Sequence, residues 1–395
     1  MSVMSGLSYQ QVWIMFIKGR EIYMNIKCNL KELINGLNVV SKTSASKTTM
    51  PIQEGVLIEA YGNSLRLTTY DLELGCEHKF DCNVIENGKT VVDIKTLNEI
   101  VRRIEDEEIE ITVDNTLFTL KSKTGVFKLA IMNPDEFTKL PVFSVDNSIE
   151  ISQKYFKEMV RRTVFSVSTD ENRPVYNGSL IKVEDNILTV VAIDGFRLSL
   201  RKKLSSKNIN NFKAIIPGRT LNELLKILTD NEEEILKIGV NKNQALFEIG
   251  NSILVSRIIE GEFLNYNSII PETCSTKVKV KTKNLLDAFE RVALFARENK
   301  EKDKKSPVKL KANIDGIMLS CVSDAGDAKE GIVSFVEGND IEVGFNPRYV
   351  IEALKVIDDE EIIIEFNSNI SPVLLKPVNG NEFIYVVLPI KLKND

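Results

Sequence analysis

The sequence predicts an α+β fold in which one two-helix, antiparallel-sheet domain occurs in three tandem copies. Two sets of helical segments support this prediction, and the members of each set recur about every 125 residues. That spacing is the size of a domain rather than of a short solenoid repeat. The first set begins at Ile26, Ile151 and Val280, and the second begins at Val91, Ile215 and Gly344.

Each of these segments predicts an amphipathic helix, because its apolar residues are spaced three and four positions apart. In the first copy the spacing gives stripes at Leu30, Leu33, Ile34, Leu37 and at Leu97, Ile100, Val101, Ile104. The second copy has Phe156, Met159, Val160, Val164 and Leu221, Leu224, Leu225, Leu228. The third has Leu285, Ala288, Phe289, Val292 and Val350, Ala353, Leu354, Ile357.

Alternating, β-branched segments lie between and after the helices and predict antiparallel strands. Turn pairs mark hairpins at matching places in the three copies, at Gly62-Asn63, Asp185-Asn186 and Asp315-Gly316. A second block of hairpins closes each copy. We therefore expect each copy to cover one face of its sheet with its two helices.

The repeat sets the expected domain boundaries at 24–147, 148–277 and 278–395. Residues 1–23 lie outside the repeat, contain the only tryptophan, Trp13, and are interpreted as an N-terminal extension. They do not resemble a secretory signal, because their charges follow the apolar part. Met24 is the expected natural start.

The composition is that of a globular protein, with 43% hydrophobic and 27% charged residues among 395. No apolar run is long enough to cross a membrane, so no membrane partner is expected. The five cysteines are scattered and lack zinc-site spacing, which favours buried thiols in a reducing cytosol. We therefore expect a cytoplasmic location.

Charge is unevenly distributed along the chain. The net charge is -5, but the six helix-bearing segments contain 24 Lys or Arg against 12 Asp or Glu, which leaves 27 basic and 44 acidic residues elsewhere. A basic face on any one helix has a simpler explanation, namely solvation of an exposed surface. The same bias in six helices favours one basic surface along an arc of three domains. Two such arcs could close a ring that holds duplex DNA through its backbone, independently of sequence.

Catalytic motifs are missing from the sequence. The only histidine, His78, has no nucleophile motif beside it, and no phosphate-binding loop or zinc-protease motif occurs. Acidic clusters at 105–108 and 232–234 are expected to be solvated turns, although paired carboxylates also allow a Mg²⁺-dependent nuclease. We expect a non-enzymatic protein without metal or cofactor.

Six short strings carry a family resemblance through their order and spacing on the repeat. They are MPI (50–52), TYDLEL (69–74), AIDGFRLSL (192–200), EGEFLNY (260–266), GFNPRYV (344–350) and YVVLPIKL (385–392). In these strings the chain resembles the bacterial β sliding clamp, the processivity subunit of DNA polymerase III, from Met24 to Leu392. The resemblance implies a head-to-tail homodimer that forms a six-domain ring around duplex DNA.

The resemblance also implies a hydrophobic cleft between the second and third domains that binds short peptides of partner proteins. The implied partners are the catalytic subunit of DNA polymerase III, the clamp loader, other polymerases and mismatch repair proteins. An ordinary strand core is the alternative explanation for most of the implied cleft residues. The full set of implied cleft residues is Tyr176, Ile193, Gly195, Phe196, Arg197, Leu198, Leu264, Ile269, Ile370, Pro372, Val386, Val387, Leu388, Pro389 and Ile390.

Two further sets of residues follow from the resemblance. At the ring interface, Phe127 and Leu129 would meet Leu294 and Phe295 of the other chain, although all four also suit a domain core. DNA contacts are implied for Lys47, Arg219 and Arg348. Further lining candidates are Lys95, Arg102, Arg103, Arg161, Arg162 and Arg297.

The chain departs from the family pattern near the implied cleft. Phe196 stands where the family often has His, Leu264 where it often has Pro, and Ser268 near a position that is commonly basic. Three residues, 393–395, follow the leucine at which the family usually ends. These departures leave an alternative open, a divergent clamp paralogue that binds peptides as a scaffold without encircling DNA.

Overall fold

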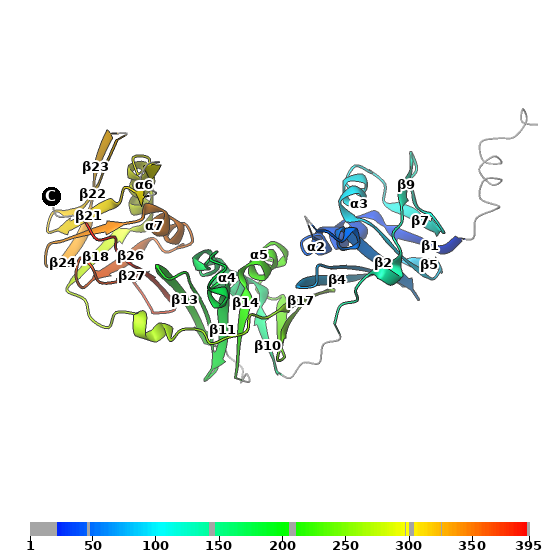
Figure 1. Ribbon diagram of the computed structural model, residues 1–395, viewed down its shortest axis with the longest axis horizontal. Coiled ribbons are helices and arrows are strands. Elements are labelled where there is room, and N and C mark those ends of the chain that lie inside the picture. Colours follow the sequence, from blue (N-terminus) through cyan, green and yellow to red (C-terminus); the bar gives the residue numbers. More distant parts are fainter. Residues whose placement is uncertain are drawn as a thin grey trace, which may run out of the picture. The chain divides into compact units, whose positions relative to one another are not determined.

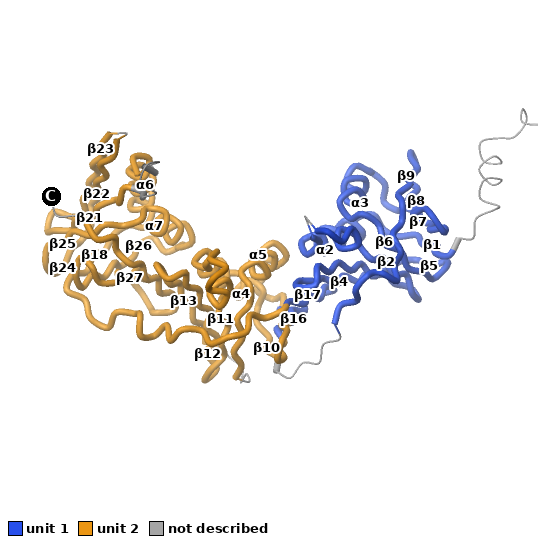
Figure 2. The backbone as a smooth tube through the Cα atoms, in the orientation of Figure 1, with its two compact units in different colours: residues 1–144, 236–238, 246–256 blue, residues 145–235, 239–245, 257–395 orange. Residues whose placement is uncertain are grey.

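The computed structural model describes residues 22–45, 48–141, 147–204, 211–296, 298–299, 304–324 and 326–392. The extension at 1–21 and the tail at 393–395 lie outside these ranges. The chain forms two compact units (Figure 2). Unit 1 comprises residues 1–144, 236–238 and 246–256, and unit 2 comprises 145–235, 239–245 and 257–395.

All six predicted helices are present in the structure. The two helices of unit 1 pack against each other, as do the two helices of each pair in unit 2. Figure 1 shows α4 and α5 together beside the strands of the second copy, and α6 and α7 together beside those of the third. The helices are α2 (Leu30–Val40), α3 (Ile94–Val101), α4 (Gln153–Arg161), α5 (Gly218–Ile227), α6 (Thr282–Ala293) and α7 (Pro347–Leu354).

Most residues of the apolar stripes are buried as predicted, whereas Ile34, Ile100, Ile104 and Leu225 are half-buried. Leu33 and Leu37 of α2 and Leu285 and Phe289 of α6 are completely buried. Three helices begin at a side chain that caps free backbone N–H groups. The caps are Asn29 for α2, Asp93 for α3 and Asn346 for α7.

Unit 1 contains two antiparallel sheets, in the strand orders β5-β1-β7-β8-β9 and β16-β17-β4-β3-β2-β6. Its strands are β1 (Ile22–Asn29), β2 (Gly55–Tyr61), β3 (Ser64–Tyr70), β4 (Leu74–Asp81), β5 (Asn83–Glu86), β6 (Gly88–Asp93), β7 (Glu108–Asp114), β8 (Leu117–Lys121), β9 (Val126–Ala130), most of β16 (Gln244–Ile249) and β17 (Ser252–Arg257). The 3₁₀ turns are η1 (Pro51–Glu54) and η2 (Pro134–Glu136).

Unit 2 contains a nine-stranded sheet in the order β14-β11-β12-β13-β28-β27-β26-β18-β24 and a four-stranded sheet in the order β23-β22-β21-β25. The strands of the larger sheet are β11 (Gly178–Glu184), β12 (Ile187–Ile193), β13 (Arg197–Leu204), β14 (Phe212–Pro217), β18 (Thr276–Lys281), β24 (Ser334–Gly338), β26 (Glu361–Phe366), β27 (Val373–Pro377) and β28 (Phe383–Val387). The smaller sheet consists of β21 (Val308–Asn313), β22 (Gly316–Ser323), β23 (Gly326–Ile332) and β25 (Ile341–Phe345).

Several short elements complete the described parts of the chain. The remaining strands are β10 (Asn147–Ser152) in unit 2, β15 (Ile235–Val240), which contributes residues to both units, and the two-residue pair β19 (Glu298–Asn299) and β20 (Lys304–Lys305). The remaining 3₁₀ turns are η3 (Val164–Ser166), η4 (Pro174–Tyr176) and η5 (Tyr266–Ile269).

The predicted hairpins lie where the turn pairs placed them. Asp185 and Asn186 both have positive φ, at 51° and 61°, in the two-residue turn between β11 and β12. That backbone twist matches the twist of the flanking strands, and Asn and Asp tolerate it better than most residues. Gly62 and Gly316 supply the positive φ in the corresponding turns of the other copies.

The sheets differ from the expectation of one separate sheet for each copy. In unit 2, β13 of the second copy pairs with β28 of the third, with Arg197 opposite Val387 and Leu200 opposite Ile384. In unit 1, β17 of the second copy pairs with β4 of the first. Paired strands of neighbouring copies thereby satisfy N–H and C=O groups that an isolated sheet edge would expose. The expected boundary at 277/278 falls inside β18.

Substitution of Phe289 tests whether this residue belongs to the core of unit 2. Its side chain is fully buried and meets Phe345 edge to face at 6.4 Å between ring centroids. We expect Phe289→Ala to lower the free energy of unfolding of unit 2 by ~3–5 kcal/mol in urea denaturation, because it removes buried area and leaves a cavity. The matched control is Phe335→Ala, whose ring is 68% exposed and whose loss should change stability by less than ~0.5 kcal/mol. Equal effects of the two substitutions would contradict this assignment of the core.

Candidate ligand cleft and basic helix surface

Unit 2 contains a hollow of about 300 Å³ that is lined mainly by apolar side chains. Four separate segments form it: η4, the turn between β12 and β13, the chain around η5, and the end of β28. The lining residues are Arg173, Tyr176, Ile193, Gly195, Phe196, Arg197, Leu198, Leu264, Ile269, Val386 and Leu388. We call this hollow the cleft.

The structure brings ten of the fifteen predicted cleft residues together in this lining. The other five are not among its lining residues. Ile370 is exposed, Val387 is fully buried, and Ile390 donates its backbone N–H to the carbonyl of Gly344. Pro372 and Pro389 are half-buried. The sequence reasoning missed Arg173, which directly precedes the proline that starts η4.

A tight turn between β12 and β13 forms one wall of the cleft. The side chain of Asp194 accepts hydrogen bonds from the backbone N–H groups of Phe196 and Arg197, at 2.9 and 3.0 Å. Gly195 between them has a φ of +92°, which a side chain would strain. The turn directs Phe196 outward, where its side chain is 59% exposed, and directs Arg197 inward, where it is 6% exposed.

The buried guanidinium of Arg197 is held by three partners. Its Nε donates to Asp194 Oδ2 at 2.9 Å, its Nη1 to Glu352 Oε2 at 2.5 Å, and its Nη2 to the carbonyl oxygen of Phe165 at 2.6 Å. The guanidinium also lies over the ring of Tyr349, 4.6 Å from the ring centroid. A buried charge is tolerated when it is paired and hydrogen-bonded in this way.

Glu352 of α7 connects this buried arginine to the protein surface. Its Oε1 accepts from Nε of Arg348, one helical turn earlier, at 2.7 Å. The side chain of Arg348 is exposed. Burial alone would raise the pKa of Glu352, but hydrogen bonds from Arg348 and Arg197, together with their charges, lower it below the usual 4.5.

Phe196 extends the cleft wall over α7. Its ring stacks on that of Tyr349, with centroids 6.2 Å apart and an interplanar angle of 22°. The backbone carbonyl of Tyr349 in turn accepts a hydrogen bond from the hydroxyl of Tyr385 at 2.8 Å. Phe196 and Tyr349 therefore form an aromatic pair beside the cleft.

Eight of the nine predicted DNA-contacting residues fall into three groups. Lys95, Arg102 and Arg103 of unit 1 and Arg219 and Arg348 of unit 2 are exposed. Arg161 is half-exposed and paired with Asp358. Lys47 and Arg297 lie outside the described residues.

Arg162 differs from the other candidates because it is 7% exposed. Its Nη2 lies 3.2 Å from Asp358 Oδ2 and its Nη1 3.5 Å from Asp359 Oδ2, and its guanidinium lies over the ring of Phe383. These contacts join α4 to the segment after α7 within unit 2. Arg162 thus has a packing role in this structure, and its guanidinium is not presented to solvent as a phosphate contact requires.

The predicted interface residues lie at sheet edges and helix ends. Phe127 and Leu129 are half-buried on β9, which is the edge strand of its sheet in unit 1. In unit 2, Leu294 follows α6 and is 70% exposed, whereas Phe295 packs partly against the core of the third copy. β23 forms an edge of the four-stranded sheet, and its first residue, Gly326, lies close to the Phe295 ring.

The histidine and the cysteines are the residues that a catalytic explanation would use. His78 is buried on β4, with Nδ1 2.7 Å from the Ser252 hydroxyl, and burial lowers its pKa. The five cysteines are unpaired. Within the described ranges, no three His, Cys, Asp or Glu side chains gather closely enough to hold a metal ion, and no helix is long and apolar enough to span a bilayer.

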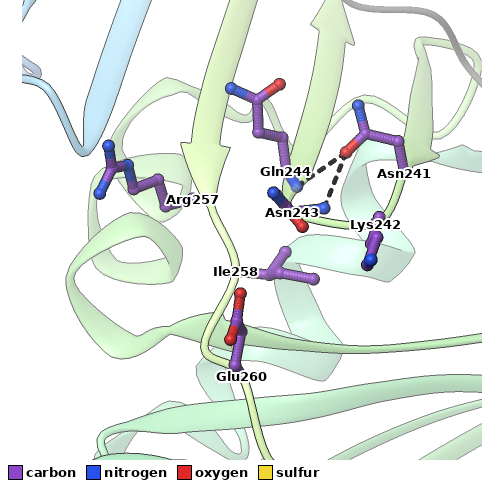
Figure 3. A pocket seen from close by; sticks show the side chains of 7 residues that line it. All are labelled: Asn241, Lys242, Asn243, Gln244, Arg257, Ile258 and Glu260. Carbon is purple, nitrogen blue, oxygen red and sulfur yellow. Dashed lines mark hydrogen bonds between the residues drawn. The ribbon is translucent and has the colours of Figure 1, made fainter.

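A second hollow in unit 2, of about 780 Å³, is polar (Figure 3). It lies between the β15–β16 turn and the chain after β17. Asn241 Oδ1 accepts from the backbone N–H groups of Asn243 and Gln244, at 3.0 and 2.9 Å, and Asn243 accepts from the N–H of Ile258 at 3.1 Å. These polar groups stabilise the turn itself and do not converge on a ligand.

The fold and the cleft define a class of protein: a repeated α+β scaffold with an apolar cleft and exposed basic side chains on and beside its helices. Sequence profiles identify the family. Residues 24–141, 150–265 and 267–391 match the N-terminal, central and C-terminal domains of the DNA polymerase III beta subunit. The chain belongs to this family, the bacterial beta sliding clamps, and its function is that of a DNA sliding clamp.

Individual relatives agree with this assignment. The beta sliding clamp of Halalkalibacterium halodurans is 36% identical over 373 residues, which cover 91% of this chain and 97% of the relative. That of Bacillus subtilis is 32% identical with the same coverage. Among solved structures, a sliding clamp from Bacillus subtilis has a TM-score of 0.89 at 31% identity, covering 94% of this chain and all of that one. A putative beta subunit from Eubacterium rectale has a TM-score of 0.88 at 33% identity, covering 93% and 100%.

The lowered pKa of Glu352 predicts a pH-dependent contribution to stability. A carboxyl group whose pKa is lower in the folded state stabilises the fold above its unfolded pKa, and this contribution is lost as the pH falls through the folded pKa. We expect wild type to be more stable than Glu352→Gln at about pH 7 and this difference to shrink below the usual value of 4.5. Urea denaturation of both proteins across this range measures it. A difference independent of pH would show that the charge of Glu352 does not stabilise the fold.

Proposed function

We propose that two copies of this chain close into a ring around duplex DNA and that the cleft tethers partner proteins by short peptide segments. The observation that carries the tethering proposal is the convergence of four separate segments of unit 2 on one apolar hollow. Phe196, Leu264 and Leu388 are apolar and partly exposed. Apolar side chains of a bound peptide would pack against them and be removed from water. Arg173 at the rim supplies a polar group that can orient the peptide.

Leu and Phe side chains are the anchors that such a cleft suits best. The proposed partners are the catalytic subunit of DNA polymerase III, the clamp loader, other polymerases and mismatch repair proteins. A solved sliding clamp from Pseudomonas aeruginosa, 22% identical with a TM-score of 0.88, is bound to griselimycin. We propose that griselimycin also binds this chain, in the cleft.

Exposed basic side chains are proposed to hold the DNA. Lys95 in the first turn of α3, Arg102 and Arg103 directly after α3, Arg219 on α5 and Arg348 on α7 belong to the helix-bearing segments in which basic residues outnumber acidic ones. Contacts to phosphates carry no sequence information, so the ring can slide. Binding should weaken as salt rises, because each phosphate contact releases counterions.

Two sheet edges are proposed to form the ring interface. An edge strand exposes unpaired N–H and C=O groups that a second chain can satisfy. β9 presents Phe127 and Leu129, and β23 lies beside Phe295 with the exposed Leu294 nearby. A contact of β9 on one chain with β23 on the other, made twice, closes a two-fold ring.

The remaining parts of the proposal concern organisation and setting. We propose three domains at 24–147, 148–277 and 278–395, with the second and third joined by the nine-stranded sheet. The chain is proposed to act as a non-catalytic accessory subunit without a cofactor. Its proposed setting is the bacterial cytoplasm, where the chromosome is replicated.

Topological retention tests the ring. Protein loaded onto nicked circular DNA by a clamp loader and ATP should remain bound at moderate salt, because a closed ring cannot leave a circle. Cutting the circle once should release the protein by sliding from the ends. The measurement is the fraction of protein that elutes with DNA before and after the cut. Equal release from circles and linear DNA would favour a peptide-binding scaffold that does not encircle DNA.

Leu294 tests the ring interface. We expect Leu294→Glu to shift the protein from dimer to monomer in sedimentation equilibrium, because a charge would be buried without a partner. Ile314→Glu is the matched control. Ile314 is 90% exposed in the β21–β22 turn, at the end of that sheet away from Gly326. A dimer that survives Leu294→Glu, or is lost equally in the control, would contradict this interface.

A further inference from the structure

One carboxylate lies between the cleft and the exposed side chain of Arg348 on α7. Glu352 accepts from the buried Arg197 through Oε2 and from the exposed Arg348 through Oε1. Arg197 lines the cleft, and Arg348 is a proposed phosphate contact.

On the cleft side, Glu352 positions the wall that a peptide would meet. Arg197 is anchored to Asp194 of its own turn and to Glu352 of α7, so this guanidinium ties the turn to the helix. Tyr349 of α7 lies beneath both the guanidinium and the ring of Phe196. The orientation of Phe196 at the cleft therefore depends on how firmly Glu352 holds Arg197.

On the exposed side, Glu352 competes with any anion that approaches Arg348. The Arg348 side chain of this pair is 66% exposed and that of Glu352 29%, so water and salt weaken the pair on the Arg348 side. A DNA phosphate can therefore displace Glu352 from Arg348. The Glu352 carboxylate would then form an ion pair with Arg197 alone.

We propose that Glu352 is a positioning residue that couples the cleft to the DNA-facing surface. Phosphate binding at Arg348 releases Glu352 to Arg197, which stiffens the cleft wall and tightens peptide binding. Linkage requires the reverse effect as well, so a bound peptide tightens the hold on DNA by the same factor. This inference rests on the proposed function of the cleft and of Arg348.

The test measures both ligands on the same variants of the full-length protein. One probe is a fluorescein-labelled peptide ending in Leu-Phe. The other is a labelled duplex of about 30 base pairs at low ionic strength. Both are followed by fluorescence anisotropy, separately and then with one probe unlabelled and saturating. In the wild type we expect duplex to tighten peptide binding about five-fold.

Glu352→Gln should move the two affinities in opposite directions. Peptide binding should weaken about five-fold, because Arg197 loses a charged partner. Duplex binding should strengthen about two- to five-fold, because a negative charge leaves the phosphate-binding surface. The effect of duplex on peptide binding should disappear. A general loss of structure would weaken both ligands, so opposite signs separate positioning from misfolding.

Arg348→Ala provides a second variant at an exposed position. Without duplex, its peptide affinity should equal that of wild type with duplex, because Glu352 is already free to bind Arg197. Adding duplex should change nothing further. Should Glu352→Gln fail to fold, this variant decides the question, and a peptide affinity that still responds to duplex would overturn the coupling.

The matched control is Glu223→Gln, which removes a carboxylate from another helix of unit 2. Glu223 pairs with Lys226 at 2.8 Å on α5. Its loss should leave peptide binding and the five-fold coupling as in wild type. Wild type that binds neither probe would refute the proposed function itself. Wild type that binds both, with affinities unchanged by Glu352→Gln, would refute the coupling alone.

Discussion

The buried guanidinium of Arg197 is the interaction on which the rest of the site depends. It lies beneath the cleft, where water cannot solvate it, and its charge is tolerated because Asp194, Glu352 and the carbonyl of Phe165 accept from it. Those acceptors come from the β12–β13 turn, α7 and η3. Satisfying one charge therefore fixes three elements relative to one another and places Phe196 on the cleft wall.

The shared sheets make that arrangement possible. Because β13 pairs with β28, the second and third copies form one continuous nine-stranded layer in unit 2. Residues of the β12–β13 turn and of the end of β28 then line the same hollow. Ion pairs from Arg161 and Arg162 to the segment after α7 support the same junction on the helix side. In the described parts of the chain, edge strands such as β9 and β23 are paired on one side only, and their other side is available to a second chain.

Much of the fold could be predicted because it depends on local rules. The spacing of Leu30, Leu33 and Leu37 specifies a helix with one apolar face, and Asp185-Asn186 specifies a tight hairpin turn. The pairing of β13 with β28 could not be predicted this way, since register between distant strands leaves no local signal. The burial of Arg162 was missed for the same reason, because Arg161 and Arg162 look equivalent in sequence and only packing buries one of them.

The sequence by itself determined the threefold repeat, the six helices, the hairpins and, through its resemblance, the family that the profiles then showed. Local periodicity and turn chemistry are written into neighbouring residues, so no tertiary information is needed to read them. Only the tertiary structure decided that Glu352 joins Arg197 to Arg348 and that Arg173 reaches the cleft. These contacts join groups up to 155 residues apart, and their geometry exists only once the sheet has closed between the copies.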